Sequence, residues 1–114
     1  MATYMFLGKH QPARVTTFME NPDSAGRRFP ALVEELGGTV IATYFCMTGS
    51  FDILAIAEFA DEETAHAAIR LVKAMPDGFA DLEITALASP EDARAAMKRA
   101  SSVGASVVTP GKAH

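Results

Sequence analysis

Hydrophobic and polar positions divide this chain into short segments that alternate between the period of a strand and that of a helix. Four segments have the composition or the alternation typical of strands: 3–9 (TYMFLGK), 39–47 (TVIATYFCM), 51–59 (FDILAIAEF) and 79–88 (FADLEITALA). The third is apolar on both faces, which predicts a central position in a sheet. A Thr-Gly-Ser loop joins it to the second strand as a hairpin, and Pro-Asp-Gly at 76–78 predicts a turn before the fourth.

In the segments between these strands, apolar residues recur at the spacing of a helix. Residues 10–38 contain two helical pieces separated by NPDSAG, and in the second piece Phe29 begins an apolar face at i, i+3, i+4 and i+7. The glycine pair that follows predicts the end of this helix. Pro30 belongs in a first turn, so the helix either begins near Arg28 or is kinked at the proline.

Two further helices are expected after the hairpin. Asp61 caps the first of them, whose apolar face consists of Ala65, Ala68, Ile69, Val72 and Met75. Ser89 and Pro90 begin the second, which we expect to run to about Ala100. Residues 101–114 lack periodicity and are rich in Gly, Ser and Pro, which predicts a mobile tail.

The order β-α-β, hairpin, β-α-β and C-terminal helix predicts an α+β fold of the ferredoxin-like kind. Its antiparallel sheet would carry the helices on one face, in a domain spanning residues 1–100 that includes the C-terminal helix. The second face of such a sheet is bare and half apolar, and a chain of 114 residues gains stability by covering it with a second copy. We therefore expect a homodimer, or a higher homo-oligomer.

Composition indicates a globular protein and argues against several kinds of partner. Apolar residues make up 49% of the chain and charged residues 21%, and the formal net charge is −4. Lys and Arg are scattered, whereas nucleic acid and anionic lipid both require clustered positive charge. The N-terminus is too short in apolar length for a signal peptide, no run approaches transmembrane length, and the single Cys46 cannot form an internal disulfide. We expect a cytoplasmic protein that binds neither nucleic acid nor membrane.

The chain contains, in order, FLGKH, ALVEELGGTVIATYFCMTGSFDILAIAEFADEETAHAA and EITALASPEDA. Together these stretches, within residues 3–97, resemble the GYD-domain family of small bacterial proteins. The family is named after a Gly-x-Tyr-Asp hairpin between two strands, which here reads Gly49-Ser50-Phe51-Asp52. Phe51 stands in place of the eponymous tyrosine, so any role of that phenol hydroxyl is absent from this chain.

The resemblance implies membership of the dimeric α/β-barrel superfamily, in which two ferredoxin-like sheets pack face to face to form a barrel. That superfamily includes cofactor-independent monooxygenases, muconolactone-isomerase-like enzymes, haem-handling proteins and ligand-sensing domains. The GYD family itself has no single well-established activity. The resemblance therefore specifies the fold and leaves the function open.

Asp52 and His10 each allow a structural and a functional interpretation. Asp52 would either accept backbone N–H bonds across its hairpin or, at the rim of a barrel, orient a ligand or act as a base. His10 follows the first strand and would be either a solvent-exposed side chain or a base or axial ligand in a cleft. For both residues we favour the structural interpretation.

Tyr4, Tyr44 and Glu58 complete, with Asp52, the set of candidate ligand-binding residues. The two tyrosines lie on the first two strands, where their amphipathic rings suit a pocket wall or, equally, core or dimer packing. Glu58 interrupts an apolar central strand, and Glu83 lies on the last strand. Each is either a buried carboxylate with a raised pKa or one that reaches water or an arginine of the partner.

No cofactor or metal is expected. The chain has no G-x-G-x-x-G motif, no P-loop and no spacing of Cys and His typical of a zinc site. Glu63-x-x-His66 is one Glu-x-x-His motif, whereas a di-iron site needs two. The leading hypothesis is a small-ligand-binding dimeric α/β-barrel protein. A competing one is a cofactor-independent monooxygenase or isomerase that acts on a small aromatic or enolisable substrate, with a His or carboxylate as the base. A third is a protein-interaction module without a ligand, docking through its last helix and tail.

Overall fold

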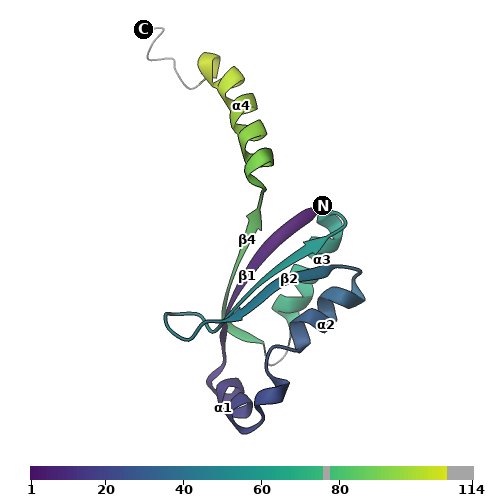
Figure 1. The fold of residues 1–114 in the computed structure, drawn as a ribbon, viewed down its shortest axis with the longest axis vertical. Coiled ribbons are helices and arrows are strands. Elements are labelled where there is room, and N and C mark those ends of the chain that lie inside the picture. The colour runs from purple at the N-terminus through teal and green to yellow at the C-terminus, as the bar shows by residue number, and fades with distance from the viewer. Residues whose placement is uncertain (76–77, 108–114) are drawn as a thin grey trace.

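The computed structural model describes residues 1–75 and 78–107, and in them four strands form one antiparallel sheet (Figure 1). The strands are β1 (Ala2–His10), β2 (Thr39–Phe45), β3 (Ile53–Phe59) and β4 (Phe79–Leu87). Their order in the sheet is β2-β3-β1-β4, with every neighbouring pair antiparallel. This is the predicted ferredoxin-like arrangement, and the predicted central position of β3 is confirmed.

Helices occupy the connections where they were predicted. They are α1 (Pro12–Glu20), the short 3-10 helix η1 (Pro22–Ser24), α2 (Arg28–Glu35), α3 (Glu62–Ala74) and α4 (Pro90–Val107). α2 begins at Arg28, which places Pro30 in its first turn, where a missing N–H removes no helical hydrogen bond. Gly37 follows with a φ of 75°, a left-handed conformation that ends the helix without steric cost.

Both predicted N-caps are present. The Asp61 carboxylate accepts a hydrogen bond of 2.8 Å from the backbone N–H of Thr64, at the start of α3. The Ser89 hydroxyl accepts one of 3.0 Å from the backbone N–H of Asp92, at the start of α4. Each cap satisfies a backbone donor that the first helical turn leaves unpaired.

The C-terminal helix is longer than predicted. α4 continues to Val107, past the predicted end near Ala100, so residues 101–107 of the predicted mobile tail are helical. Glycine within a helix costs only about 1 kcal/mol relative to alanine, so Gly104 does not stop an otherwise Ala-rich segment. Residues 108–114 of that tail, and 76–77 of the predicted turn, lie outside the described residues.

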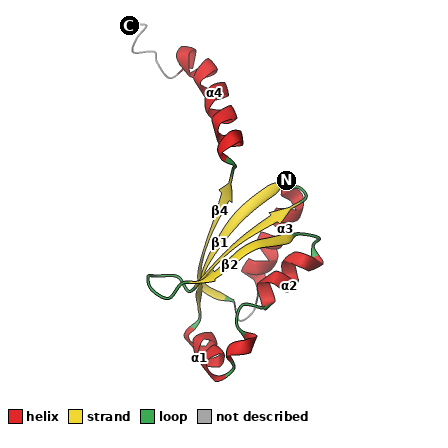
Figure 2. Cartoon of the chain, viewed as in Figure 1, coloured by secondary structure: helices red, strands yellow, loops and turns green. Residues whose placement is uncertain are grey.

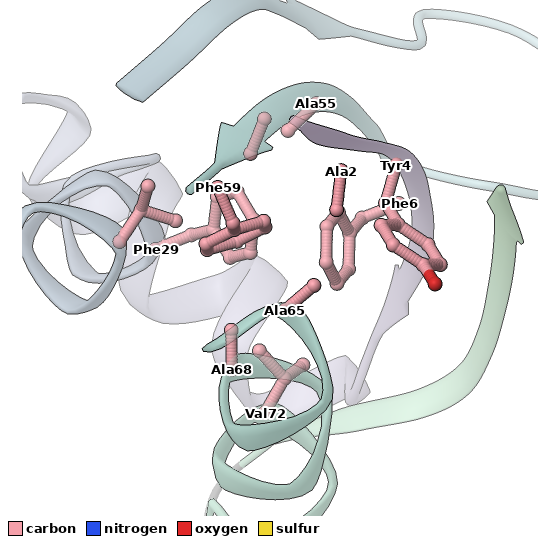
Figure 3. Packing of buried hydrophobic residues seen from close by; sticks show 11 residues of the cluster. Ala2, Tyr4, Phe6, Phe29, Ala55, Phe59, Ala65, Ala68 and Val72 are labelled. Atoms are coloured by element: carbon pink, nitrogen blue, oxygen red, sulfur yellow. The ribbon is translucent and has the colours of Figure 1, made fainter. Parts of the chain in front are cut away.

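The core lies between the sheet and the helices α2 and α3 (Figure 3). Alternate residues of β1 and β3 point into it and meet apolar residues of the two helices; the buried set is Ala2, Tyr4, Phe6, Phe29, Val33, Ala55, Ala57, Phe59, Ala65, Ala68 and Val72. Ala65 and Ala68 on α3 and Ala57 on β3 are completely buried. Small side chains at these positions allow the helix to lie close to the strands.

The other face of the sheet is left open by α2 and α3. The pairing of β1 with β3 places Met5 beside Ile56 and Leu7 beside Leu54 on this face, and Glu58 lies on it as well. An irregularity between Val40 and Ala42 shifts the register of β2 by one residue. A shift of one residue exchanges the two faces of a strand, and it brings Tyr44 opposite Leu54.

α4 extends away from the rest of the domain as a continuation of β4 (Figure 2). The radius of gyration of the chain is consequently 18.6 Å, whereas a compact domain of this length has about 13 Å. Met97 on α4 is 66% exposed. In the part of the chain that the structure describes, no helix is both long and apolar enough to span a membrane.

The tight contact between α3 and the sheet predicts that a larger side chain at Ala68 destabilises the fold. Ala68→Leu should lower the free energy of unfolding by about 1–3 kcal/mol, because the core has no room for three more carbons. Ala67→Leu, at an exposed neighbour on the same helix, should change it by less than about 0.5 kcal/mol. Urea denaturation of both variants measures the difference, and equal values would contradict the close packing of α3.

Candidate functional site

The side chain of His10 lies between two aromatic rings at the end of β1. Its ring stacks on that of Phe79, with centroids 5.3 Å apart and planes at 22°. It meets the Phe18 ring edge-on, at 5.1 Å and 76°. Phe79 is the first residue of β4 and pairs with His10 across the sheet, while Phe18 comes from α1. Three separate elements therefore hold this imidazole in place.

Gly8 makes room for this arrangement. A Cβ atom built on Gly8 would overlap the ring of Phe79. The absence of a side chain at Gly8 therefore lets the Phe79 ring come close to β1, in the position from which it stacks on His10.

Asp52 connects the base of the β2–β3 hairpin to the same end of β1. Its Oδ2 accepts a hydrogen bond of 2.8 Å from the backbone N–H of His10. Its own backbone N–H donates to the carbonyl of Gly8, and its carbonyl accepts from Cys46 N–H, both at 2.8 Å. The carboxylate thus accepts a backbone N–H, as the structural interpretation requires, but from β1 and not across its own hairpin.

His10 lines both a small cavity and an open groove. The cavity has a volume of about 40 Å³, and its walls include Arg14, Phe18, Ser24, Arg28, Phe29 and Phe79. The groove has a volume of about 460 Å³ and lies between α1 and the hairpin, lined by Val15, Phe18, Met19, Phe45, Met47 and Asp52 among others. His10 and Phe18 line both spaces.

Nε2 of His10 is buried and has no hydrogen-bond partner in the described residues. Burial lowers the pKa of this imidazole below its ordinary value of 6.5, because a charged ring loses solvation. The Asp52 carboxylate opposes this shift and the Arg14 guanidinium adds to it. At neutral pH the ring is therefore uncharged, with one nitrogen able to donate and one able to accept a hydrogen bond.

The family of the chain follows from a comparison of its sequence with family models. The GYD domain model matches residues 4–97. This chain belongs to the GYD-domain family. No curated protein matches the sequence.

Two solved structures that resemble this chain come from bacteria. An X-ray structure of protein Atu4242 from Agrobacterium tumefaciens is 13% identical, with a TM-score of 0.50 over 77% of this chain and 92% of that one. An uncharacterized NIPSNAP domain protein from Burkholderia xenovorans is 12% identical, with a TM-score of 0.49 over 78% of this chain and 94% of that one. At such identities the Agrobacterium structure shows a shared fold and nothing about function.

The four candidate ligand-binding residues of this GYD-domain protein lie in three different places. Asp52 lines the groove beside His10. Tyr44 and Glu58 lie on the open face of the sheet, where Tyr44 is 67% exposed and Glu58 is half-buried. Tyr4 points to the opposite, helix-covered face. The described chain therefore does not bring the four side chains together, and their role in binding stays a prediction.

The Tyr4 hydroxyl reaches the start of α3, where it donates a hydrogen bond of 2.5 Å to Oε2 of Glu62. Nε2 of His66 lies 3.5 Å from the same hydroxyl oxygen. The hydrogen bond to Glu62 raises the pKa of the Tyr4 phenol, with burial and the Glu62 charge adding to it. Within residues 1–75 and 78–107, no group of three or more His, Cys, Asp or Glu side chains could hold a metal ion.

The expectation that His10 is a solvent-exposed side chain is wrong. The ring is half-buried because Phe18 and Phe79 cover it, and neither residue was among the candidates. Arg14 was also missed; its guanidinium lies 4.9 Å from the centroid of the Phe18 ring, one helical turn along α1. A cation and an aromatic ring at i and i+4 were the available sequence signal for this pair.

The lowered pKa of His10 predicts that acid destabilises the fold in a specific pH range. Because the unfolded state takes up a proton at its ordinary pKa of 6.5 and the folded state only at lower pH, the free energy of unfolding falls as the pH drops below 6.5. The slope is at most about 1.4 kcal/mol per pH unit, and less here because solvent partly screens the ring.

Urea denaturation between about pH 5 and pH 8 measures this slope, a range that lies above the titration of ordinary carboxylates. His10→Phe keeps an aromatic ring between Phe18 and Phe79 and should remove the slope. His66→Gln, at an exposed position of α3, should retain it. Equal slopes in the wild type and His10→Phe would show that the His10 imidazole is not held neutral by burial.

Proposed function

We propose that this GYD-domain protein is a homodimer that binds a small molecule at the His10 site. The observation that carries the binding proposal is the buried Nε2 atom of His10, which has no partner among the described residues. A buried polar atom without a hydrogen bond lowers the stability of the fold by about 1–3 kcal/mol, so such atoms are rare in folded proteins and each one needs an explanation. A ligand that reaches this nitrogen would supply the missing hydrogen bond.

The groove beside His10 supports the same proposal. Its volume of about 460 Å³ falls within the range of small-molecule sites, about 300–1,000 Å³. Its walls are mostly apolar, and the ionisable side chains among its described lining residues are those of His10, Asp52 and Cys46. A mostly apolar concave surface with a few polar groups is the usual composition of a ligand site.

The open face of the sheet supports the homodimer. It presents Met5, Leu7, Leu54 and Ile56 in adjacent positions of two central strands, and α2 and α3 both pack on the other side. A second copy of the sheet, packed face to face at a spacing of about 10 Å, would cover these side chains. Tyr44 and Glu58, two of the predicted ligand-binding residues, would then line the space between the two sheets.

Binding at the His10 site is tested by NMR of the histidine rings during titration with small aromatic compounds that carry a carboxylate, phosphate, amide or ammonium group. We expect at least one compound to shift the His10 ring signals while those of exposed His66 stay in place, because His10 lines the groove and His66 does not. The absence of any His10 shift at millimolar concentrations of every compound would contradict a ligand site there.

The neutral state of His10 favours a second candidate, an enzyme that removes a proton from an enolisable substrate. The imidazole would take the proton from the carbon next to a carbonyl, which leaves an enolate, and would return a deuteron from D₂O. Exchange at that carbon of phenylacetone, followed by NMR, distinguishes the two functions. Exchange that the wild type accelerates and His10→Phe does not would indicate the enzyme, and exchange at the uncatalysed rate would indicate binding alone.

The homodimer predicts a specific effect of charge on the open sheet face. Ile56→Lys should give a folded monomer, because a dimer would bury the new ammonium group without a partner. Leu71→Lys introduces the same charge on α3, away from this face, where Leu71 is 48% exposed, and should leave the dimer intact. Light scattering after size exclusion gives the masses. A monomeric wild type, or a dimeric Ile56→Lys variant, would contradict the proposed interface.

A further inference from the structure

We propose that the ligand of the His10 site is a monocarboxylate with an apolar body, its carboxylate in the cavity beside Arg14 and Arg28 and its body in the groove. This inference rests on the proposed function, because it assumes that a small molecule occupies the site. It goes beyond that function by assigning the chemical class of the ligand and two residues that recognise it.

The walls of the cavity are positively charged. Arg14 and Arg28 both line it, together with His10 and Ser24, and no carboxylate is among its described lining residues. Neither guanidinium has a carboxylate partner within ion-pair distance in residues 1–75 and 78–107. An anion entering the cavity would therefore meet two cations, neither of them in an ion pair with a carboxylate of the described residues, and guanidinium groups bind carboxylates with paired hydrogen bonds.

Arg14 is held where it can serve this purpose. It is half-buried on α1, and its guanidinium lies over the Phe18 ring at 4.9 Å from the centroid. The same Phe18 ring contacts His10 edge-on. The Arg14 charge also lowers the pKa of His10, so the guanidinium lies close enough to the imidazole for the two groups to interact.

The size and charge of the site favour one carboxylate over a larger or more highly charged group. A cavity of about 40 Å³ holds the equivalent of about three water molecules, which is enough for a head group and not for a whole ligand. Asp52, which lines the groove, offsets one of the two arginine charges. The remaining charge of about one unit matches a monoanion and not a phosphate dianion.

His10 and Phe18 form the boundary that a ligand of this kind would bridge, because both line the cavity and the groove. In the tautomer with its proton on Nε2, the neutral imidazole can donate a hydrogen bond to a carboxylate oxygen. That bond would satisfy the nitrogen that is buried without a partner. The apolar walls of the groove would cover the remainder of the molecule.

Calorimetric titration with phenylacetate, its neutral analogue phenylacetamide and phenyl phosphate tests the proposal. We expect phenylacetate to bind at least about tenfold more tightly than phenylacetamide, because hydrogen bonds between an arginine and a carboxylate are stronger than those between an arginine and a neutral amide. The affinity for phenylacetate should fall as NaCl is added, since counterions screen the arginines. Equal affinities for the acid and the amide, or tighter binding of phenyl phosphate, would overturn the assignment.

Variants that each remove one positive charge test which arginines bind the carboxylate of phenylacetate. Arg14→Gln and Arg28→Gln should each weaken phenylacetate binding about tenfold and leave phenylacetamide binding unchanged. Arg70→Gln removes the same charge from an exposed position on α3 that lines neither space, and should have no effect. Thermal unfolding of each variant shows that it is folded. An unchanged affinity in both cavity variants would overturn the role of the arginines.

The outcomes separate this inference from the proposed function. If phenylacetamide shifts the His10 signals as strongly as phenylacetate, the ligand site stands and the carboxylate class fails. If no compound shifts them, the site itself fails. Phenylacetate binding that persists in His10→Phe and in both arginine variants would place the compound elsewhere on the protein and would contradict both.

Discussion

The hydrogen bonds between Asp52 and the end of β1 are the constraint on which the His10 site depends. The Asp52 carboxylate accepts from the backbone of His10, and the Asp52 backbone donates to Gly8, so the base of the hairpin is fixed to β1 from two sides. The hairpin then forms one wall of the groove, and α1 forms the other. Without the carboxylate, the His10 N–H would lose its partner at a cost of about 1–3 kcal/mol. The Gly-x-Tyr-Asp motif that names the family therefore has a structural role in this chain that requires its Asp and not its Tyr.

A second constraint is the number of helices that the chain can place on its sheet. α2 and α3 cover one face, where Ala57, Ala65 and Ala68 let helix and strands approach closely. α4 does not return to cover the other face but extends away from it. An apolar sheet face and a long unattached helix both leave surface exposed that isolated domains of this size usually bury. Both features support the proposed homodimer, in which a second copy would cover exposed surface.

The order and type of the elements could be predicted from the sequence because local signals agreed with the fold. Pro30 in a first turn, Gly37 after a helix, and the caps Asp61 and Ser89 each fix one boundary through their own backbone chemistry. The end of α4 could not be predicted, because Ser and Gly weaken a helix without ending it. The side of the sheet on which each strand residue lies also required the structure, since the irregularity near Ile41 moves Tyr44 to the open face.

His10 and Asp52 were candidates, but the surroundings of His10 were missed for a different reason, which is that Phe79 lies far from His10 in the sequence and Phe18 is placed by the fold of α1. The ferredoxin-like order does place the end of β1 beside the start of β4, so the neighbourhood of His10 and Phe79 follows from topology alone. The position of Phe18 depends on how α1 turns back over the sheet end, which no local signal specifies. The His10 site belongs to a single chain, whereas Tyr44 and Glu58 lie on the open face of the sheet, where the homodimer is proposed. The proposed ligand recognition at His10 and the proposed assembly through the sheet therefore involve different residues, and loss of one leaves the residues of the other in place.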